Sequence, residues 1–230
     1  MKITKKTLIH LIISALIIIS SIIGSIQTIN YDSSSNGNDI LYFTVQSNLW
    51  LAAIYLIVLI LELISFKKNK DIIPSYIHTL KFIFVVSITI TFIVFFTILV
   101  PEIGSYVISM PGSLLVHLVS PVLAIIDYLI FENKQIRKKQ TVIYPLIPPL
   151  IYFIVIIILS YNGLTFVNDQ KVPYFFLDYE RLTWFNISNN KIGVFYWVLI
   201  LSILILGISY SLLKLNEVIQ TKIALKREER

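Results

Sequence analysis

Long apolar segments recur along the chain and are separated by short polar stretches. A helix needs about 20 predominantly apolar residues to cross a lipid bilayer. The pattern therefore predicts an all-α fold, a polytopic membrane protein in which a bundle of six transmembrane helices forms a single domain over residues 1–230. The predicted spans cover approximately residues 8–29, 41–64, 76–100, 113–131, 143–160 and 193–213.

The composition agrees with this class of protein. Hydrophobic residues make up 57% of the chain and charged residues 14%, whereas about a quarter of the residues of a soluble domain are charged. The chain has no cysteine, which excludes disulfides, zinc–thiolate sites and thiol nucleophiles. Its three histidines, His10, His78 and His117, have no metal-ligand spacing. We therefore expect neither a metal site nor a cofactor.

The basic residues predict the direction of the spans. Most of the 19 Lys and Arg residues lie before the first span, around the start of the third, between the fourth and fifth, or after the sixth. Cytoplasmic segments carry an excess of Lys and Arg, so we expect a multi-pass protein of the cell membrane with both termini cytoplasmic. Because the basic residues are divided among four segments, we expect membrane lipids, and no nucleic acid, as partners. The sequence carries no signal for an oligomeric state.

The predicted outer loop at residues 161–192 is unusually rich in aromatic residues. Its stretch KVPYFFLDYERLTWFN, residues 171–186, holds six of them, which is atypical of a disordered loop. Two placements stay open. The loop lies on the membrane surface, anchored by its aromatic side chains, or it folds over the bundle as a cap.

Polar side chains in the second and fourth spans fall on one side of each predicted helix. They are Thr44, Ser47, Asn48, Tyr55 and Glu62 in the second span, and Ser113, His117, Ser120 and Asp127 in the fourth. Their spacings are mostly three, four or seven residues, which is the period of one helix face. Pro121 interrupts the fourth span and frees a backbone carbonyl. Since polar groups in lipid face the protein interior, the two stripes are expected to face each other or a shared cavity.

Thr44 and His117 lie at equal depth in these spans. Each is four or five residues below the outer end, or about 6–8 Å, so a hydrogen bond between them is geometrically possible. A neighbouring base activates a threonine hydroxyl as a nucleophile, and histidine is the usual base. Gln46, Ser47 and Asn48 are candidate donors to the oxyanion that such a reaction forms. Alternatively, these side chains only hold the helices together through hydrogen bonds.

Glu62 and Asp127 lie at the other end of the same two spans, about 15 Å or more from the first pair. They are expected to pair with Lys81, His78 or nearby lysines, and a proton or ion pathway is the alternative. His10 and His78 lie close to the cytoplasmic ends of their helices. We expect both histidines at the membrane interface.

Three motifs carry a resemblance to a known family: YFTVQSN at residues 42–48, HLVSPVLAIIDYLIF at 117–131 and PYFFLD at 173–178. They resemble the bacterial Pr-six-Pr family of six-span membrane proteins. That family is in turn similar to the androgen-induced-gene type of transmembrane threonine hydrolases of animals, which cleave fatty acid esters of hydroxy fatty acids. The resemblance implies that Thr44 is the nucleophile and His117 its partner, with a further motif at Tyr174 to Asp178.

The first hypothesis is therefore an intramembrane lipid-ester hydrolase. Thr44 would attack the ester carbonyl, and His117 would act as base and then as acid. Ser120 would join the oxyanion or substrate-binding groups, and Asp178 or Glu180 of the outer loop would orient the histidine. The second hypothesis is a non-enzymatic six-span membrane protein, either a small transporter or a lipid-binding bundle. A third is a structural or assembly partner of another membrane protein, for which the sequence carries no signal. A shared scaffold does not determine the reaction.

Overall fold

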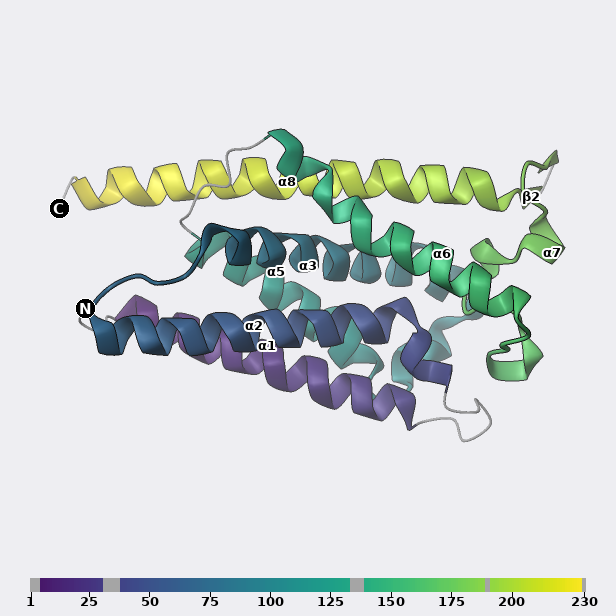
Figure 1. Cartoon of the computed structure of the whole chain (residues 1–230), viewed down its shortest axis with the longest axis horizontal. Helices are drawn as coiled ribbons and strands as arrows, with labels where there is room; N and C mark the ends of the chain where they lie inside the picture. The colour runs from purple at the N-terminus through teal and green to yellow at the C-terminus, as the bar shows by residue number, and fades with distance from the viewer. Residues whose placement is uncertain (1–4, 31–37, 133–138, 189–190, 229–230) are drawn as a thin grey trace.

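The computed structural model describes residues 5–30, 38–132, 139–188 and 191–228 as an all-α polytopic bundle (Figure 1). The α-helices are α1 (Lys5–Ile29), α2 (Phe43–Lys68), α3 (Ser75–Val94), α4 (Val100–Ile103), α5 (Ser120–Phe131), α6 (Ile147–Tyr161), α7 (Tyr179–Leu182) and α8 (Val194–Glu228). Two short π-helices are η2 (Phe95–Leu99) and η4 (Leu115–Val119). The 3₁₀ turns are η1 (Asn38–Leu41), η3 (Ser105–Ser109), η5 (Lys139–Val142), η6 (Tyr144–Leu146), η7 (Val167–Asp169) and η8 (Phe175–Leu177). Strands β1 (Ile187–Ser188) and β2 (Lys191–Ile192) pair antiparallel.

Within the described residues, five helices are long and apolar enough to cross a membrane, and the apolar helix over Leu115–Phe131 is shorter. These six elements correspond to the six predicted spans. The main difference is α8, which continues to Glu228, well beyond the predicted end at residue 213. The fold class predicted from the sequence is therefore confirmed, and it is compatible with an integral membrane protein.

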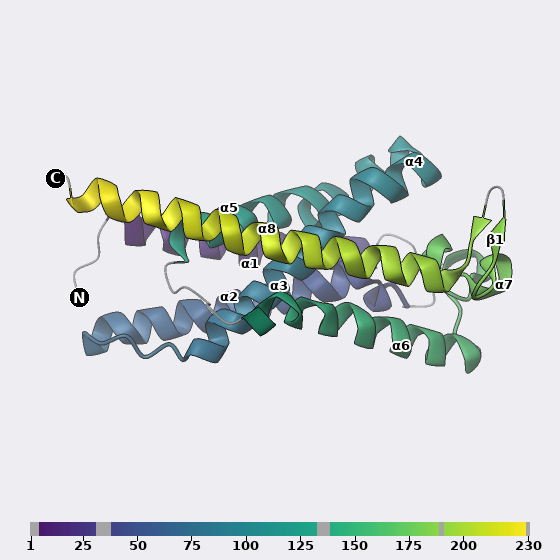
Figure 2. The ribbon, with the colours of Figure 1, turned by 90° about the horizontal axis from the view of Figure 1, so that it is seen from above.

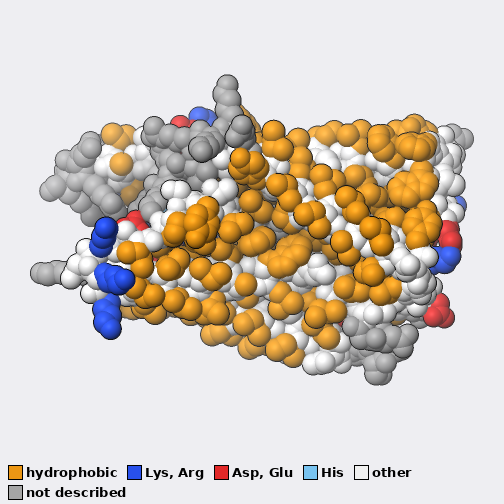
Figure 3. Space-filling model, in the orientation of Figure 1, with side chains coloured by type: hydrophobic (Ala, Val, Ile, Leu, Met, Phe, Trp, Pro, Cys, Tyr) orange, Lys and Arg blue, Asp and Glu red, His pale blue; other side chains and the backbone are white. Residues whose placement is uncertain are grey.

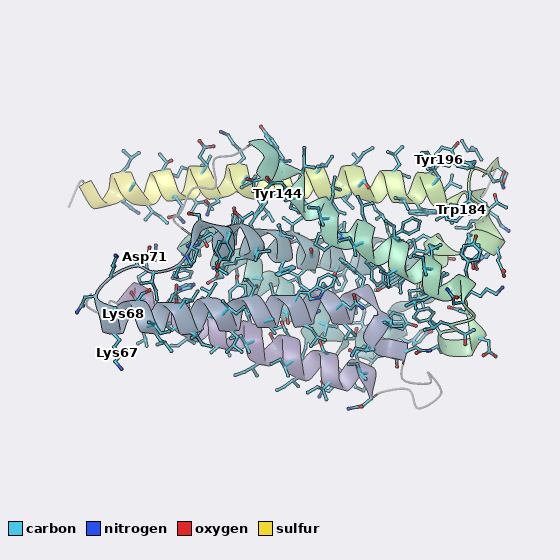
Figure 4. The ribbon with its side chains drawn as sticks, viewed as in Figure 1. Lys67, Lys68, Asp71, Tyr144, Trp184 and Tyr196 are labelled. Carbon is cyan, nitrogen blue, oxygen red and sulfur yellow. The ribbon has the colours of Figure 1, made fainter. Side chains whose placement is uncertain are left out.

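The helices run along the long axis of the molecule, so the bundle has two ends (Figure 1, Figure 2). The start of α1, the end of α8 and the labelled Lys67 and Lys68 lie at one end, which we call the basic end (Figure 4). The described part of residues 161–192 lies at the opposite end, which we call the cap end. Between the ends, hydrophobic side chains cover much of the face shown in Figure 3.

Helix α3 is the most buried of the long helices. Its Phe82, Val85 and Val86 are fully buried, and α2, α5 and α8 pack against it. Large apolar side chains also point outward, including Ile57 at 44% and Ile203 at 61% exposure. Such a continuous apolar exterior is suited to hydrocarbon, where helices satisfy their own backbone hydrogen bonds.

The cap-end loop is folded onto the bundle. Phe166, Tyr174, Phe176 and Leu182 are all less than 10% exposed. The ring of Tyr42, which precedes α2, meets the rings of Phe166 and Tyr174 edge to face. Of the two placements that the sequence left open, the described residues adopt the cap.

The ionisable residues of the spans meet near the basic end. Lys81 Nζ lies 2.7 Å from Asp127 Oδ2, which confirms the predicted pairing of Asp127. Glu62 pairs with His10, at 3.2 Å, rather than with a lysine. His10 and His78, which we expect at the membrane interface, have side chains only 12% and 10% exposed, because each ring is turned inward onto carboxylates.

The end of α5 is held by amide side chains from the extension of α8. Asn216 Nδ2 donates to the backbone carbonyls of Tyr128 and Glu132, at 2.8 and 2.9 Å. The last carbonyls of a helix have no partner within the helix. Asn216, which is itself buried, therefore supplies the missing donor.

Replacing Asn216 with leucine is expected to lower the free energy of unfolding by about 1–3 kcal/mol, since buried carbonyls then lose their donor. Thermal unfolding in detergent, followed by tryptophan fluorescence, measures the change. Leu225→Ala, at an exposed position of the same helix, is the control and is expected to change little. A variant at Asn216 as stable as the natural chain would contradict this role.

Candidate active site

The candidate site lies near the cap end, where the first turn of α2 meets η4. Thr44 is the second residue of α2 and is 7% exposed. Its Oγ1 lies 3.2 Å from Nε2 of His117. The structure thus brings together the two side chains that the sequence places at equal depth.

His117 lies at the centre of a π-helical turn with an identifiable cause. Pro121 has no backbone N–H, so the backbone carbonyl of His117, four residues earlier, loses its α-helical partner. The hydroxyl of Ser120 donates to the carbonyl of Leu115, at 2.9 Å.

The imidazole of His117 stacks on the ring of Phe95, the first residue of the other π-helix, with centroids 3.6 Å apart. Short π-helical turns are rare and occur frequently at functional sites.

Two glycines let this turn pack closely against α1. A Cβ on Gly24 would lie 2.7 Å from Val116 Cγ1 and 2.8 Å from Leu115 Cβ. Gly112 has a φ of +76°, and a Cβ there would lie 2.5 Å from the carbonyl oxygen of Gly24. Glycine alone combines this backbone conformation with such an approach. Helix α1 therefore supports the turn that carries His117.

The hydrogen bonds of His117 determine which ring nitrogen carries the proton. Nδ1 lies 3.0 Å from the backbone carbonyl of Ser113, which can only accept. Nδ1 is therefore a donor, and Nε2 of the neutral ring keeps its lone pair. It follows that the Thr44 hydroxyl donates to Nε2, which is the arrangement required of a general base.

Ser47 and Asn48 hold the backbone around the threonine. Ser47 Oγ and Asn48 Nδ2 donate to the carbonyl of Thr44, at 3.1 and 2.8 Å. Asn48 Nδ2 also donates to the carbonyl of Val116, at 3.1 Å, and so ties α2 to η4. Both hydrogens of this amide are occupied. The side chain that we expected to donate to an oxyanion thus positions the backbone in this structure.

Tyr174 of the cap closes the site above Thr44. The backbone N–H of Thr44 donates to the Tyr174 hydroxyl oxygen, at 3.3 Å. This N–H is in the first turn of α2, where backbone donors have no partner within the helix. The Tyr174 hydroxyl also has a hydrogen of its own to donate, and the side chains of Thr44 and Tyr152 lie within its reach.

An apolar cavity of about 100 Å³ opens beside Thr44. It lies between α2, α3, α6, α8 and the cap, with Thr44 and Tyr174 among the residues that line it. Val198, Leu201 and Ile205 line it from one face of α8. Ile205 is eleven residues, or about 16 Å, beyond the cap-end start of α8. A lining of this composition suits an apolar chain with one polar end.

The other predicted site residues lie apart from the pair. The Ser120 hydroxyl lies 3.0 Å from that of Ser20 and so faces α1. Gln46 is half-buried, and its side chain forms no hydrogen bond within the described residues. Neither residue is aimed at Thr44 by a contact in the structure.

Asp178 and Glu180 of the cap have other partners than His117. Asp178 accepts from the backbone N–H groups of Glu180 and Arg181 and thus caps the start of α7. Glu180 accepts a hydrogen bond from Lys171, and this bond raises the pKa of the Lys171 ammonium. The group that orients His117 is instead the carbonyl of Ser113.

Comparison with known proteins gives no relative: no family model, no curated protein and no solved structure matches the chain. Among the described residues, no group of three or more His, Asp or Glu side chains is arranged to hold a metal ion. The fold and the site define the class of the protein by themselves. It is an all-α polytopic bundle with a buried threonine–histidine pair beside an apolar cavity.

Proposed function

We propose that the protein is an intramembrane hydrolase of lipid esters. The observation that carries the proposal is the Thr44 hydroxyl 3.2 Å from a histidine nitrogen whose other ring nitrogen is held by a carbonyl. The cavity beside Thr44 supports it, since its apolar lining suits the hydrocarbon part of an ester. The resemblance of the surrounding motifs to the Pr-six-Pr family, and through it to transmembrane threonine hydrolases, points to the same reaction.

The proposed reaction uses the pair twice. Thr44 Oγ1 attacks the ester carbonyl while its proton moves to His117 Nε2, and the Tyr174 hydroxyl donates to the developing oxyanion. Collapse of the intermediate expels the alcohol, which takes the proton from His117. Water then attacks the acyl-threonine with His117 as base, and the fatty acid leaves as Thr44 regains its proton.

We also propose an orientation for the protein in the cell membrane. Because the basic end carries most of the Lys and Arg residues, we place it and both termini in the cytoplasm. The site then lies in the outer half of the bilayer. Lipid esters would enter sideways from that leaflet, with no need to leave the membrane.

The apolar cavity also favours a second candidate function, a lipid-binding bundle without catalysis. Such a protein would keep fatty acid binding in a Thr44 variant and would show no covalent chemistry in the natural chain. The small-transporter alternative has no comparable feature among the described residues, since the ionisable groups named above gather near one end.

A fluorophosphonate probe tests the proposed function, since it labels activated hydroxyl nucleophiles. The purified chain is expected to be labelled, Thr44→Val to lose labelling completely, and His117→Gln to label at least about 100-fold more slowly, because the base is lost. Thr97→Val is the control, since this exposed threonine donates to the carbonyl of Ile93. Labelling that persists in Thr44→Val, or an unlabelled natural chain, would overturn the proposal.

A further inference from the structure

Six ionisable side chains form a chain of contacts near the basic end, in which acids and bases alternate. In order they are Glu62, His10, Asp127, Lys81, Glu132 and His78. The successive N to O distances are 3.2, 3.1, 2.7, 3.6 and 3.0 Å. The side chains come from α1, α2, α3 and α5 with its C-terminal neighbour, and none is more than 18% exposed. The proposed hydrolysis uses none of them.

His10 is the histidine of this chain that lies between two acids. Its Nδ1 lies 3.2 Å from Glu62 Oε1, and its Nε2 lies 3.1 Å from Asp127 Oδ1. An ionised carboxylate only accepts hydrogen bonds, and a neutral imidazole has only one N–H. One of the two contacts would therefore set a lone pair against a lone pair. Imidazole is more basic than a carboxylate, so the additional proton belongs on the ring.

The charge that this proton gives His10 is compensated by the groups around the ring. Its ring stacks on Phe131, with centroids 5.0 Å apart, and Lys6 Nζ lies over the same Phe131 ring, 5.6 Å from its centroid. Tyr55 donates to Asp127 Oδ2, at 2.8 Å. Three carboxylates and one lysine leave the buried chain with a surplus of negative charge, and His10 and His78 are the groups that can offset it. Uncompensated buried charge is strongly unfavourable.

The bridge at His10 holds α1 to α2 and α5, and the same helix supports the active-site turn. Gly24 of α1 packs against Leu115 and Val116, fourteen residues or about 21 Å along the helix from His10. Between these points, Ser20 contacts Ser120 of α5. A displacement of α1 at the basic end would thus reach the turn that carries His117.

We propose that the Glu62–His10–Asp127 bridge is a proton-binding site that holds α1 in place, so that loss of its proton releases α1 and withdraws support from the His117 turn. Proton binding and the release of α1 are independent of the reaction. Only the consequence for catalysis rests on the proposed function.

The first experiment reads the proton directly, by ¹⁵N NMR of the histidine rings in the full chain in lipid vesicles. His78→Gln and His117→Gln assign the three histidines. At neutral pH both ring nitrogens of His10 are expected to be protonated, and His117 is expected to have one protonated and one bare nitrogen. A bare ring nitrogen on His10 at neutral pH would overturn the proposal.

The second experiment follows α1. The chain has no cysteine, so Ile12→Cys and Ile130→Cys, both on exposed positions, accept spin labels for a distance measurement. As the pH is raised until His10 loses its proton, a narrow distance distribution is expected to broaden. His117→Gln, the control, keeps this transition, and His10→Gln is broad at every pH. An unchanged distance after His10 deprotonates, or the same transition in His10→Gln, contradicts the release of α1.

Fluorophosphonate labelling over the same pH range separates this inference from the proposed function. Labelling is expected to be lost as α1 is released, although a higher pH would otherwise favour an activated hydroxyl. Labelling that persists while α1 moves overturns the coupling. A chain that is never labelled, yet shows a protonated His10 and the α1 transition, refutes the hydrolase and leaves the proton site established.

Discussion

Lys81→Met is expected to destabilise the protein by about 3–5 kcal/mol or to prevent folding, because removal of one partner leaves uncompensated charge in the interior. Lys81 is 2% exposed, and its ammonium lies between Asp127 and Glu132. Methionine keeps an unbranched apolar side chain at this position, so the effect reports the charge rather than the packing. Thermal unfolding in detergent gives the measurement, and the exposed Lys67→Met serves as the control.

A second substitution makes this prediction specific. Adding Asp127→Asn to Lys81→Met divides the chain of six into two acid–histidine pairs, Glu62 with His10 and Glu132 with His78, each of which is neutral when its ring is charged. The single asparagine oxygen can still accept one of the two hydrogen bonds that reach Asp127, from Tyr55 or from His10. Most of the lost stability is therefore expected to return. A double variant no more stable than Lys81→Met would show that the charge account is wrong.

Gly24→Val is expected to reduce fluorophosphonate labelling by about 100-fold, since a displacement of about 1 Å near a reacting group has effects of this size. The new side chain would overlap Leu115 and Val116 and push away the turn on which His117 lies. Overpacking of this kind also costs about 1–3 kcal/mol of stability. Labelling rates at a temperature where the variant is folded separate the two effects.

The matched control for this variant is Gly207→Ala. A Cβ at Gly207 of α8 meets nothing within 4 Å, and alanine favours a helix over glycine by about 1 kcal/mol. This variant is expected to label normally and to be no less stable. Normal labelling by Gly24→Val would mean that α1 does not support the His117 turn.

The spans and the facing stripes could be predicted because both follow from the period of a helix and the thickness of a bilayer. Thr44 and His117 are at the same depth in spans that run in the same direction, so their contact required only counting along the chain. The same counting predicted the pairing of Asp127 with Lys81 and missed His10. Its position near a helix end indicated only the membrane interface, whereas α1 places the ring between two carboxylates.

Other features depend on backbone geometry that has no sequence period. Pro121 signalled a free carbonyl, but a π-helical turn centred on His117 also depends on Ser120 and on packing against Gly24. Tyr174 reaches Thr44 because the cap folds back over α2, and a loop path of this kind has no repeating pattern. Asp178 could have been read as a helix cap from its position before the short helix α7.

The central claim is that the hydroxyl of Thr44 is an activated nucleophile. Mass spectrometry of peptides from the fluorophosphonate-treated chain tests it most directly, because it locates the covalent adduct. One adduct per chain is expected, on Thr44. An adduct on Ser47, Tyr174 or any other residue, or none at all, would contradict it.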